Sequence, residues 1–106
     1  MIDRIVNQYN LTEEERSELV KVKEFLLSGE ADLVLRVFDV NEIPIIKLFL
    51  AVDVIDLDYY MRAGRIYRQA VGAVISRTLQ AKGYKKVLAK SFLLNGVRVN
   101  SSVYKK

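Results

Sequence analysis

The 106-residue chain contains no cysteine and no histidine. Without cysteine it cannot form disulfides, a thiolate nucleophile or a cysteine-ligated zinc site. Without histidine it lacks the commonest general base and the commonest metal ligand. It also contains no glycine-rich phosphate loop and no dinucleotide-binding fingerprint. We therefore expect no enzymatic activity, no cofactor, no metal and no small-molecule substrate.

Long apolar runs are also missing. The longest, near "IPIIKLFLAV", includes a lysine and is about half as long as a membrane-spanning helix. The first ten residues, "MIDRIVNQYN", lack the apolar core and the small-residue cleavage site of a signal peptide. With 51% hydrophobic and 28% charged residues, the chain is expected to fold as one cytoplasmic domain without membrane contact.

Acidic residues are absent from the last 48 residues. Residues 1–58 hold all 13 acidic residues and 6 of the 17 basic ones, so residues 59–106 hold the other 11 basic residues and no acidic one. Protein surfaces normally intersperse both signs, because blocks of one sign repel themselves. The basic block therefore indicates a polyanionic partner, unless the acidic half of the same chain or of a second subunit neutralises it.

The acidic half is expected to be helical. "MIDRIVNQY" has the spacing of a short helix, and "LTEEERSELVKVKEFLLSGE" predicts a longer helix with a capping box at Thr12 and Glu15 and a stop near Ser28-Gly29. The apolar face of the longer helix consists of Leu19, Val22, Phe25 and Leu26. We expect this face and "IPIIKLFLAV" to exceed what the rest of the chain can cover, and therefore to mediate homodimerisation.

The middle of the chain leaves two alternatives open. "ADLVLRVFDV" fits either a short buried helix or a strand, whereas Asn41 is expected to cap a helix over "EIPIIKLFLAV" with Pro44 in its first turn. The aspartates of "DVIDLDYYMRAG" are interpreted as helix caps, because no histidine or downstream acid completes a metal site. Gly64 either separates two helices or only interrupts one long helix from Tyr59 to Lys82.

An amphipathic helix pattern follows. At about 100° per residue, one side gathers Tyr67, Ala70, Val71, Val74, Ile75 and Thr78. The other side gathers Arg62, Arg65, Arg68, Gln69, Gly72, Ser76 and Gln80. A merely solvated face would include glutamates to pair with the arginines. Arginine and glutamine bind phosphates and base edges, and small residues allow close approach, so this face predicts contact with nucleic acid.

A β-hairpin is predicted over residues 85–104, because Asn95-Gly96 is a strong turn signal between β-forming segments. A two-residue turn there pairs Leu94 with Val97, Phe92 with Val99, Lys90 with Ser101 and Leu88 with Val103. This register places an apolar set on one face, toward the core: Leu88, Phe92, Leu94, Val97, Val99 and Val103. The other face, toward solvent or a partner, carries Ser91, Arg98, Asn100, Ser102 and Tyr104.

Residues 42–104 resemble a winged helix-turn-helix DNA-binding domain, because "VGAVISRTLQAKGYKKV" leads from a helical segment into a hairpin with Asn-Gly at its tip. In that family the recognition helix lies in the major groove, and the wing contacts the DNA backbone or the minor groove. The resemblance assigns to the recognition helix Arg65, Arg68, Gln69, Ser76 and Arg77, preceded by Arg62. It assigns to the wing Lys85, Lys86, Lys90 and Arg98. In size and composition the chain also resembles small basic DNA-binding proteins of crenarchaea and their viruses and plasmids.

The expected fold is mainly α with a C-terminal β-hairpin (α+β), a winged helix-turn-helix preceded by extra N-terminal helices. The single domain, residues 1–106, would comprise an acidic helical part (1–40) that dimerises and a nucleic-acid-binding part (41–106). The expected function is non-enzymatic binding of double-stranded DNA, as a nucleoid-associated protein or a transcription regulator. The alternative is an accessory subunit of a larger replication, transcription or ribosomal complex, held mainly by protein contacts.

Overall fold

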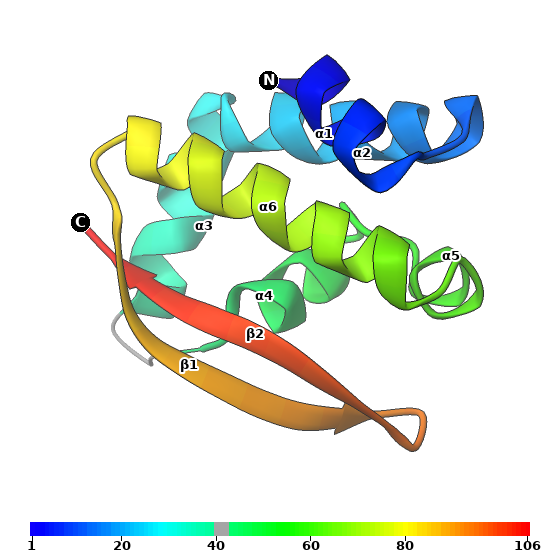
Figure 1. The fold of residues 1–106 in the computed structure, drawn as a ribbon. Coiled ribbons are helices and arrows are strands. Elements are labelled where there is room, and N and C mark those ends of the chain that lie inside the picture. The colour runs from blue at the N-terminus through cyan, green and yellow to red at the C-terminus, as the bar shows by residue number, and fades with distance from the viewer. Residues whose placement is uncertain (40–42) are drawn as a thin grey trace.

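Helices make up most of the structure, and a two-stranded antiparallel hairpin ends it (Figure 1). The structure is a computed structural model that describes residues 1–39 and 43–106. Its elements in these ranges are α1 (Ile2–Tyr9), α2 (Glu13–Leu26), α3 (Gly29–Asp39), α4 (Ile45–Ala51), α5 (Leu57–Arg62), α6 (Arg65–Ala81), β1 (Lys85–Leu94) and β2 (Val97–Lys105). The predicted class, mainly α with a C-terminal hairpin, is confirmed. Among the described helices, none combines the length and the apolar composition needed to cross a bilayer.

The first two helices form as their local signals indicate. The capping box of α2 is complete, because Thr12 Oγ1 accepts a hydrogen bond from Glu15 N–H at 3.1 Å and Glu15 Oε1 accepts one from Thr12 N–H at 2.9 Å. The ambiguous segment after Ser28 is the helix α3. Ser28 Oγ accepts a hydrogen bond from Ala31 N–H at 3.3 Å, so this residue ends one helix and caps the next.

Helix α4 begins later than the sequence predicts. Pro44 is its N-cap rather than a residue of its first turn, and the predicted cap Asn41 lies outside the described residues. Proline has no side-chain acceptor, so the first N–H groups of α4 need partners from elsewhere. Ser101 on β2 supplies one, because its hydroxyl accepts a hydrogen bond from Ile46 N–H at 3.1 Å.

Helices α5 and α6 are separate, which resolves the alternative at Gly64. This glycine has φ +95° and ψ 178°, a combination that side chains rarely allow, and it sets the direction of α6. Asp56 caps α5, as predicted, through a hydrogen bond of 2.8 Å from Tyr59 N–H to its carboxylate, whereas Asp58 lies inside the first turn of α5 and Asp53 precedes the helix with φ +58°. Two short-range signals therefore delimit α5: the Asp56 cap begins it, and the chain changes direction at Gly64 after it ends.

The core surrounds α6. All six side chains predicted for its apolar side are buried. Helices α1 and α2 cover one side of α6, and α4 and the hairpin lie on the other (Figure 1). Leu19, Val22 and Leu26 of α2 are buried within this one chain, and Phe25 meets the ring of Phe49 edge-on at 5.5 Å. The apolar side chains on which the expected homodimerisation rested, including Ile45, Ile46, Leu48 and Phe49, are therefore largely covered within one chain, and homodimerisation itself stays a prediction.

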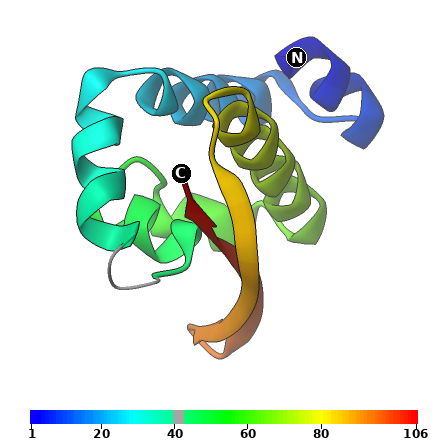
Figure 2. The same cartoon turned by 90° about the vertical axis from the view of Figure 1, so that its left-hand side faces the viewer.

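The hairpin has the predicted register. Leu94 pairs with Val97 around the Asn95-Gly96 turn, and the other three predicted pairs are present. Both turn residues have positive φ, 50° and 81°, as a two-residue hairpin turn requires. In two views at right angles, the turn lies at the end of the molecule farthest from α1 and α2 (Figures 1 and 2).

The two faces of the hairpin differ from expectation near its ends. Tyr104, predicted on the outer face, is 8% exposed and belongs to the core. Tyr104 remains on the same face as Ser102 and Asn100, but this face is turned toward α6 and lines a hollow with Ile75, so at the base of the hairpin it is buried and not exposed to solvent. On the predicted core face Val99 and Val103 are buried, but Leu88 and Val97 are 42% and 39% exposed. Helices α3 and α4 contact β2 more extensively than β1, so Leu88 on β1 is less completely covered. Val97 on β2 lies next to the turn, at the end of the hairpin.

Candidate nucleic-acid interface

The exposed face of α6 carries basic, amide and small side chains. Arg65, Gln69, Gly72 and Gln80 are exposed, and Ser76 is half-buried. Gln80 Nε2 donates a hydrogen bond to Ser76 Oγ at 3.3 Å. A Cβ placed on Gly72 would have no other atom within 4 Å, apart from its own helix and chain neighbours. The helix backbone is therefore open to a ligand at the middle of this face.

A cleft separates this face of α6 from the hairpin. It consists of two adjoining hollows of about 270 and 250 Å³, which share Tyr60, Arg68, Gly72 and Asn100 as lining residues. The polar side chains on the α6 wall of this α6–hairpin cleft are Arg65, Arg68, Gln69 and Ser76. The polar side chains on the hairpin wall include Lys86, Arg98, Asn100, Ser101 and Ser102. Of the described residues that line the cleft, four are basic and none is acidic.

Arg68 lies at the junction of the two hollows. It is half-buried, and its Nη1 donates a hydrogen bond to the Met61 carbonyl oxygen at 3.4 Å. Next to it, burial raises the pKa of Tyr60 to about 12, while the positive charge of Arg68 partly opposes that shift. Tyr60 is therefore neutral at physiological pH, and the charge of the cleft comes from its arginines and its lysine.

Arg98 occupies the opposite wall, on the hairpin. Its Nη1 donates a hydrogen bond of 2.9 Å to Ser91 Oγ on the neighbouring strand. The four basic residues of the cleft form no ion pair with any acidic residue in the described ranges. Their charge is not neutralised by the acidic half of the chain, and it remains available to an anionic ligand.

The structure brings together six of the ten predicted site residues around the cleft: Arg65, Arg68, Gln69, Ser76, Lys86 and Arg98. It places Arg77, Lys85 and Lys90 at exposed positions outside the cleft lining. Arg62 also lies outside, where it forms an ion pair of 3.6 Å with Asp58 and lies 5.4 Å from the centre of the Tyr59 ring.

Asn100 and Ser102 are among the polar cleft residues that were not predicted as site residues. They alternate with Arg98 along β2, and the predicted register already placed all three on one face. That alternation is the signal that identifies them. The small residues Gly72 and Ala89 line the cleft as well, and only the spatial approach of α6 and β1 brings them together.

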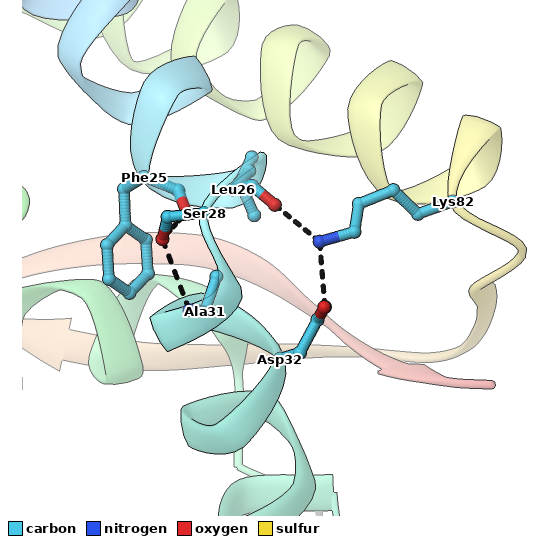
Figure 3. A network of polar contacts seen from close by, with 6 residues as sticks. All are labelled: Phe25, Leu26, Ser28, Ala31, Asp32 and Lys82. Atoms are coloured by element: carbon cyan, nitrogen blue, oxygen red, sulfur yellow. Dashed lines mark hydrogen bonds and ion pairs between the residues drawn. The ribbon is translucent and has the colours of Figure 1, made fainter.

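Lys82, also part of the basic block, has a structural role. Its Nζ donates hydrogen bonds to Asp32 Oδ1 at 2.8 Å and to the Leu26 carbonyl oxygen (Figure 3). The hydrogen bond from Lys82 holds the pKa of Asp32 below its ordinary value of 3.8. Since Leu26 ends α2 and Asp32 lies in the first turn of α3, one lysine ties the end of α6 to the junction of these two helices.

Comparisons with protein-family models, with curated proteins and with solved structures find no match to this chain. The function must therefore be inferred from the side chains that line the cleft. It offers four positive charges, two amide side chains and several hydroxyls between a helix and a two-stranded ribbon. Such a set binds phosphates through the charges and base edges through the amides.

Proposed function

We propose that this chain is a non-enzymatic duplex DNA-binding protein of the winged helix-turn-helix type, either a nucleoid-associated protein or a transcription regulator. In this proposal α5 and α6 form the helix-turn-helix, α6 is the recognition helix and the hairpin is the wing. The order of α4, α5, α6 and the hairpin supports it, as does the sharp turn at Gly64. The observation that carries the proposal is the α6–hairpin cleft, with four basic residues and no described acidic one.

The side chains divide by task in this proposal. Arg65, Lys86 and Arg98 neutralise phosphates and release counterions, which makes binding depend strongly on salt. Gln69 offers an amide donor and acceptor to base edges in the major groove. Gly72 lets the duplex approach the backbone of α6, because no side chain occupies that position.

A pair of double variants tests the proposal. Arg65→Ala/Lys86→Ala removes one charge from each wall of the cleft, and Arg4→Ala/Lys21→Ala removes two exposed charges from α1 and α2. Each is titrated against a fluorescent duplex at low and high salt, with thermal melts as the folding control. If five to seven phosphates are contacted, parent affinity should fall on the order of a thousandfold between ~50 and ~200 mM salt.

The cleft variant should bind more weakly and lose roughly two units of salt slope, since two phosphate contacts are removed. The α1–α2 variant should bind like the parent. Parent binding that is indifferent to salt, or equal losses in the two variants, would contradict the proposal.

A second candidate function is an accessory subunit of a larger nucleic-acid complex. Leu27 and Leu33, 60% and 64% exposed, lie on the acidic α2–α3 segment and favour a protein contact there. Sedimentation separates the candidates. A stable homodimer that binds duplex DNA supports the regulator or nucleoid protein, and a monomer with weak DNA affinity supports the subunit.

A further inference from the structure

The hairpin face that lines the cleft ends in an exposed leucine. From the base toward the turn, this face carries the pairs Ala89–Ser102, Ser91–Asn100 and Leu93–Arg98. Leu93 is 65% exposed, the highest value among the exposed large apolar side chains of the described residues. It lies next to the turn, at the end of the hairpin that projects away from α1 and α2 (Figures 1 and 2).

The neighbouring arginine does not cover this leucine. Arg98 is the direct cross-strand partner of Leu93, but its guanidinium donates to Ser91, one pair nearer the base of the hairpin. The long side chain of Arg98 therefore leans toward the cleft. This leaves the apolar tip and the charged group side by side on one face, both accessible to the same ligand.

The charge of the hairpin indicates which ligand covers the leucine. Residues 85–106 contain six basic residues and no acidic one. A second copy of the hairpin would bring the same six positive charges, and the two would repel each other. The minor groove of DNA has the complementary arrangement, because phosphates form both rims and the apolar base stack lies between them.

We propose that Leu93 is a wedge that enters the minor groove beside Arg98 and inserts between two base pairs, so that the protein kinks the DNA it binds. Insertion of an apolar side chain unstacks one base step and bends the duplex toward the major groove. Asn100, on the same face, offers its amide donor to the acceptors of A·T pairs in that groove, while Arg98 keeps its contact with a phosphate at the rim. This inference rests on the proposed function and adds a specific deformation of the DNA to it.

The test compares two leucines of equal exposure. Leu93→Ala truncates the wedge, and Leu33→Ala truncates a leucine on α3 that is 64% exposed. Leu93→Met keeps an apolar side chain of similar volume at the tip. Each protein is titrated against a duplex with dyes at both ends, whose energy transfer reports bending, and 2-aminopurine at a central TA step, whose fluorescence reports unstacking. Thermal melts confirm folding.

The parent, Leu33→Ala and Leu93→Met should all bend the duplex and raise the 2-aminopurine signal. Leu93→Ala should lose both signals and about tenfold in affinity, as expected when one contact with the base stack is removed. If Leu93→Ala bends the duplex as the parent does, the proposal that Leu93 is a wedge is wrong, while the proposed function of duplex binding is retained. If the parent does not bind the duplex at all, the proposed function itself fails.

Anionic membranes combine negative charge with an apolar interior, so vesicles of phosphatidylglycerol form the last arm of the experiment. Vesicle binding that depends on Leu93, together with duplex binding that does not, would overturn the inference. Duplex bending that depends on Leu93, without vesicle binding, supports it.

Discussion

Ile46 and Ser101, 55 residues apart in the chain, are joined by a buried hydrogen bond of 3.1 Å from the Ile46 N–H to the Ser101 hydroxyl. Ile46 lies in the first turn of α4, where the N-cap Pro44 offers no side-chain acceptor. Ser101 therefore caps α4 from the hairpin. The same bond fixes β2 against the helices, and with it the hairpin wall of the cleft.

Ser101→Ala is expected to destabilise the fold by about 1–2 kcal/mol, because it leaves the Ile46 N–H buried without a partner. Urea unfolding measures the loss. Ser102→Ala is the matched control, since the neighbouring serine is half-buried and points to the other face of the hairpin. Equal stability of the two variants would show that the Ile46 N–H has another acceptor.

Gly64→Ala tests the turn between α5 and α6. An alanine at φ +95° and ψ 178° is strained by about 1–3 kcal/mol, even though no other atom lies near the added Cβ. Chemical denaturation should show this loss. An unchanged free energy of unfolding would mean that the turn between α5 and α6 accepts a side chain at position 64 without strain.

Gly72→Ala is expected to have opposite effects on stability and on binding. Glycine within a helix is less stable than alanine, so the substitution should stabilise the fold by about 0.5–1 kcal/mol. The added methyl group occupies the open middle of the α6 face, and duplex affinity should fall. Gly29→Ala on α3, far from the cleft, should leave affinity unchanged. If the Gly72→Ala protein is more stable and binds the duplex as tightly as the parent, the duplex does not approach the α6 backbone at this position.

The Asp32 carboxylate should make the stability of the fold decrease at acidic pH. Its pKa lies below 3.8 in the folded state because Lys82 donates a hydrogen bond to the carboxylate. A lowered folded pKa means that the contribution to stability is complete above 3.8 and is lost as the pH falls through the folded value. Asp32→Asn should therefore lower the melting temperature at neutral pH and flatten its decline in acid.

Asp53→Asn is the control for this pH series. Asp53 is exposed and has φ +58°, a conformation that asparagine also tolerates. The melting temperature of the Asp53→Asn variant should equal that of the parent at every pH. If Asp32→Asn and the parent decline in parallel below 3.8, the Lys82–Asp32 contact does not stabilise the fold.

Local signals predicted most of the elements. The capping box at Thr12, the apolar spacing of α6 and the turn at Asn95-Gly96 each involve residues within a few positions of one another, and each is present. The hairpin register followed from the turn alone, because a two-residue loop allows one pairing. The same register placed Arg98 and Asn100 on one face.

Distant contacts account for what the sequence did not reveal. The start of α4 depends on Ser101, and the burial of Tyr104 depends on helices distant in the sequence, because it joins the core and lines the same hollow as Ile46 and Ile75. Periodicity identified the arginines of α6, but it could not separate Arg68, which lines the cleft, from Arg77, which does not. That difference arises only when the hairpin is placed beside one edge of the helix.

The position of α6 between the acidic helices and the hairpin has a consequence for how the molecule approaches a polyanion. The first turns of α1 and α2 carry acidic residues, whereas every charged residue of the hairpin is basic. The molecule is therefore an electric dipole in addition to carrying a net charge of +4. In the field of DNA it experiences a torque that turns the hairpin forward and the acidic end away. Association should therefore be faster than for a uniformly charged protein of the same net charge, and this advantage should disappear as added salt shortens the reach of the field.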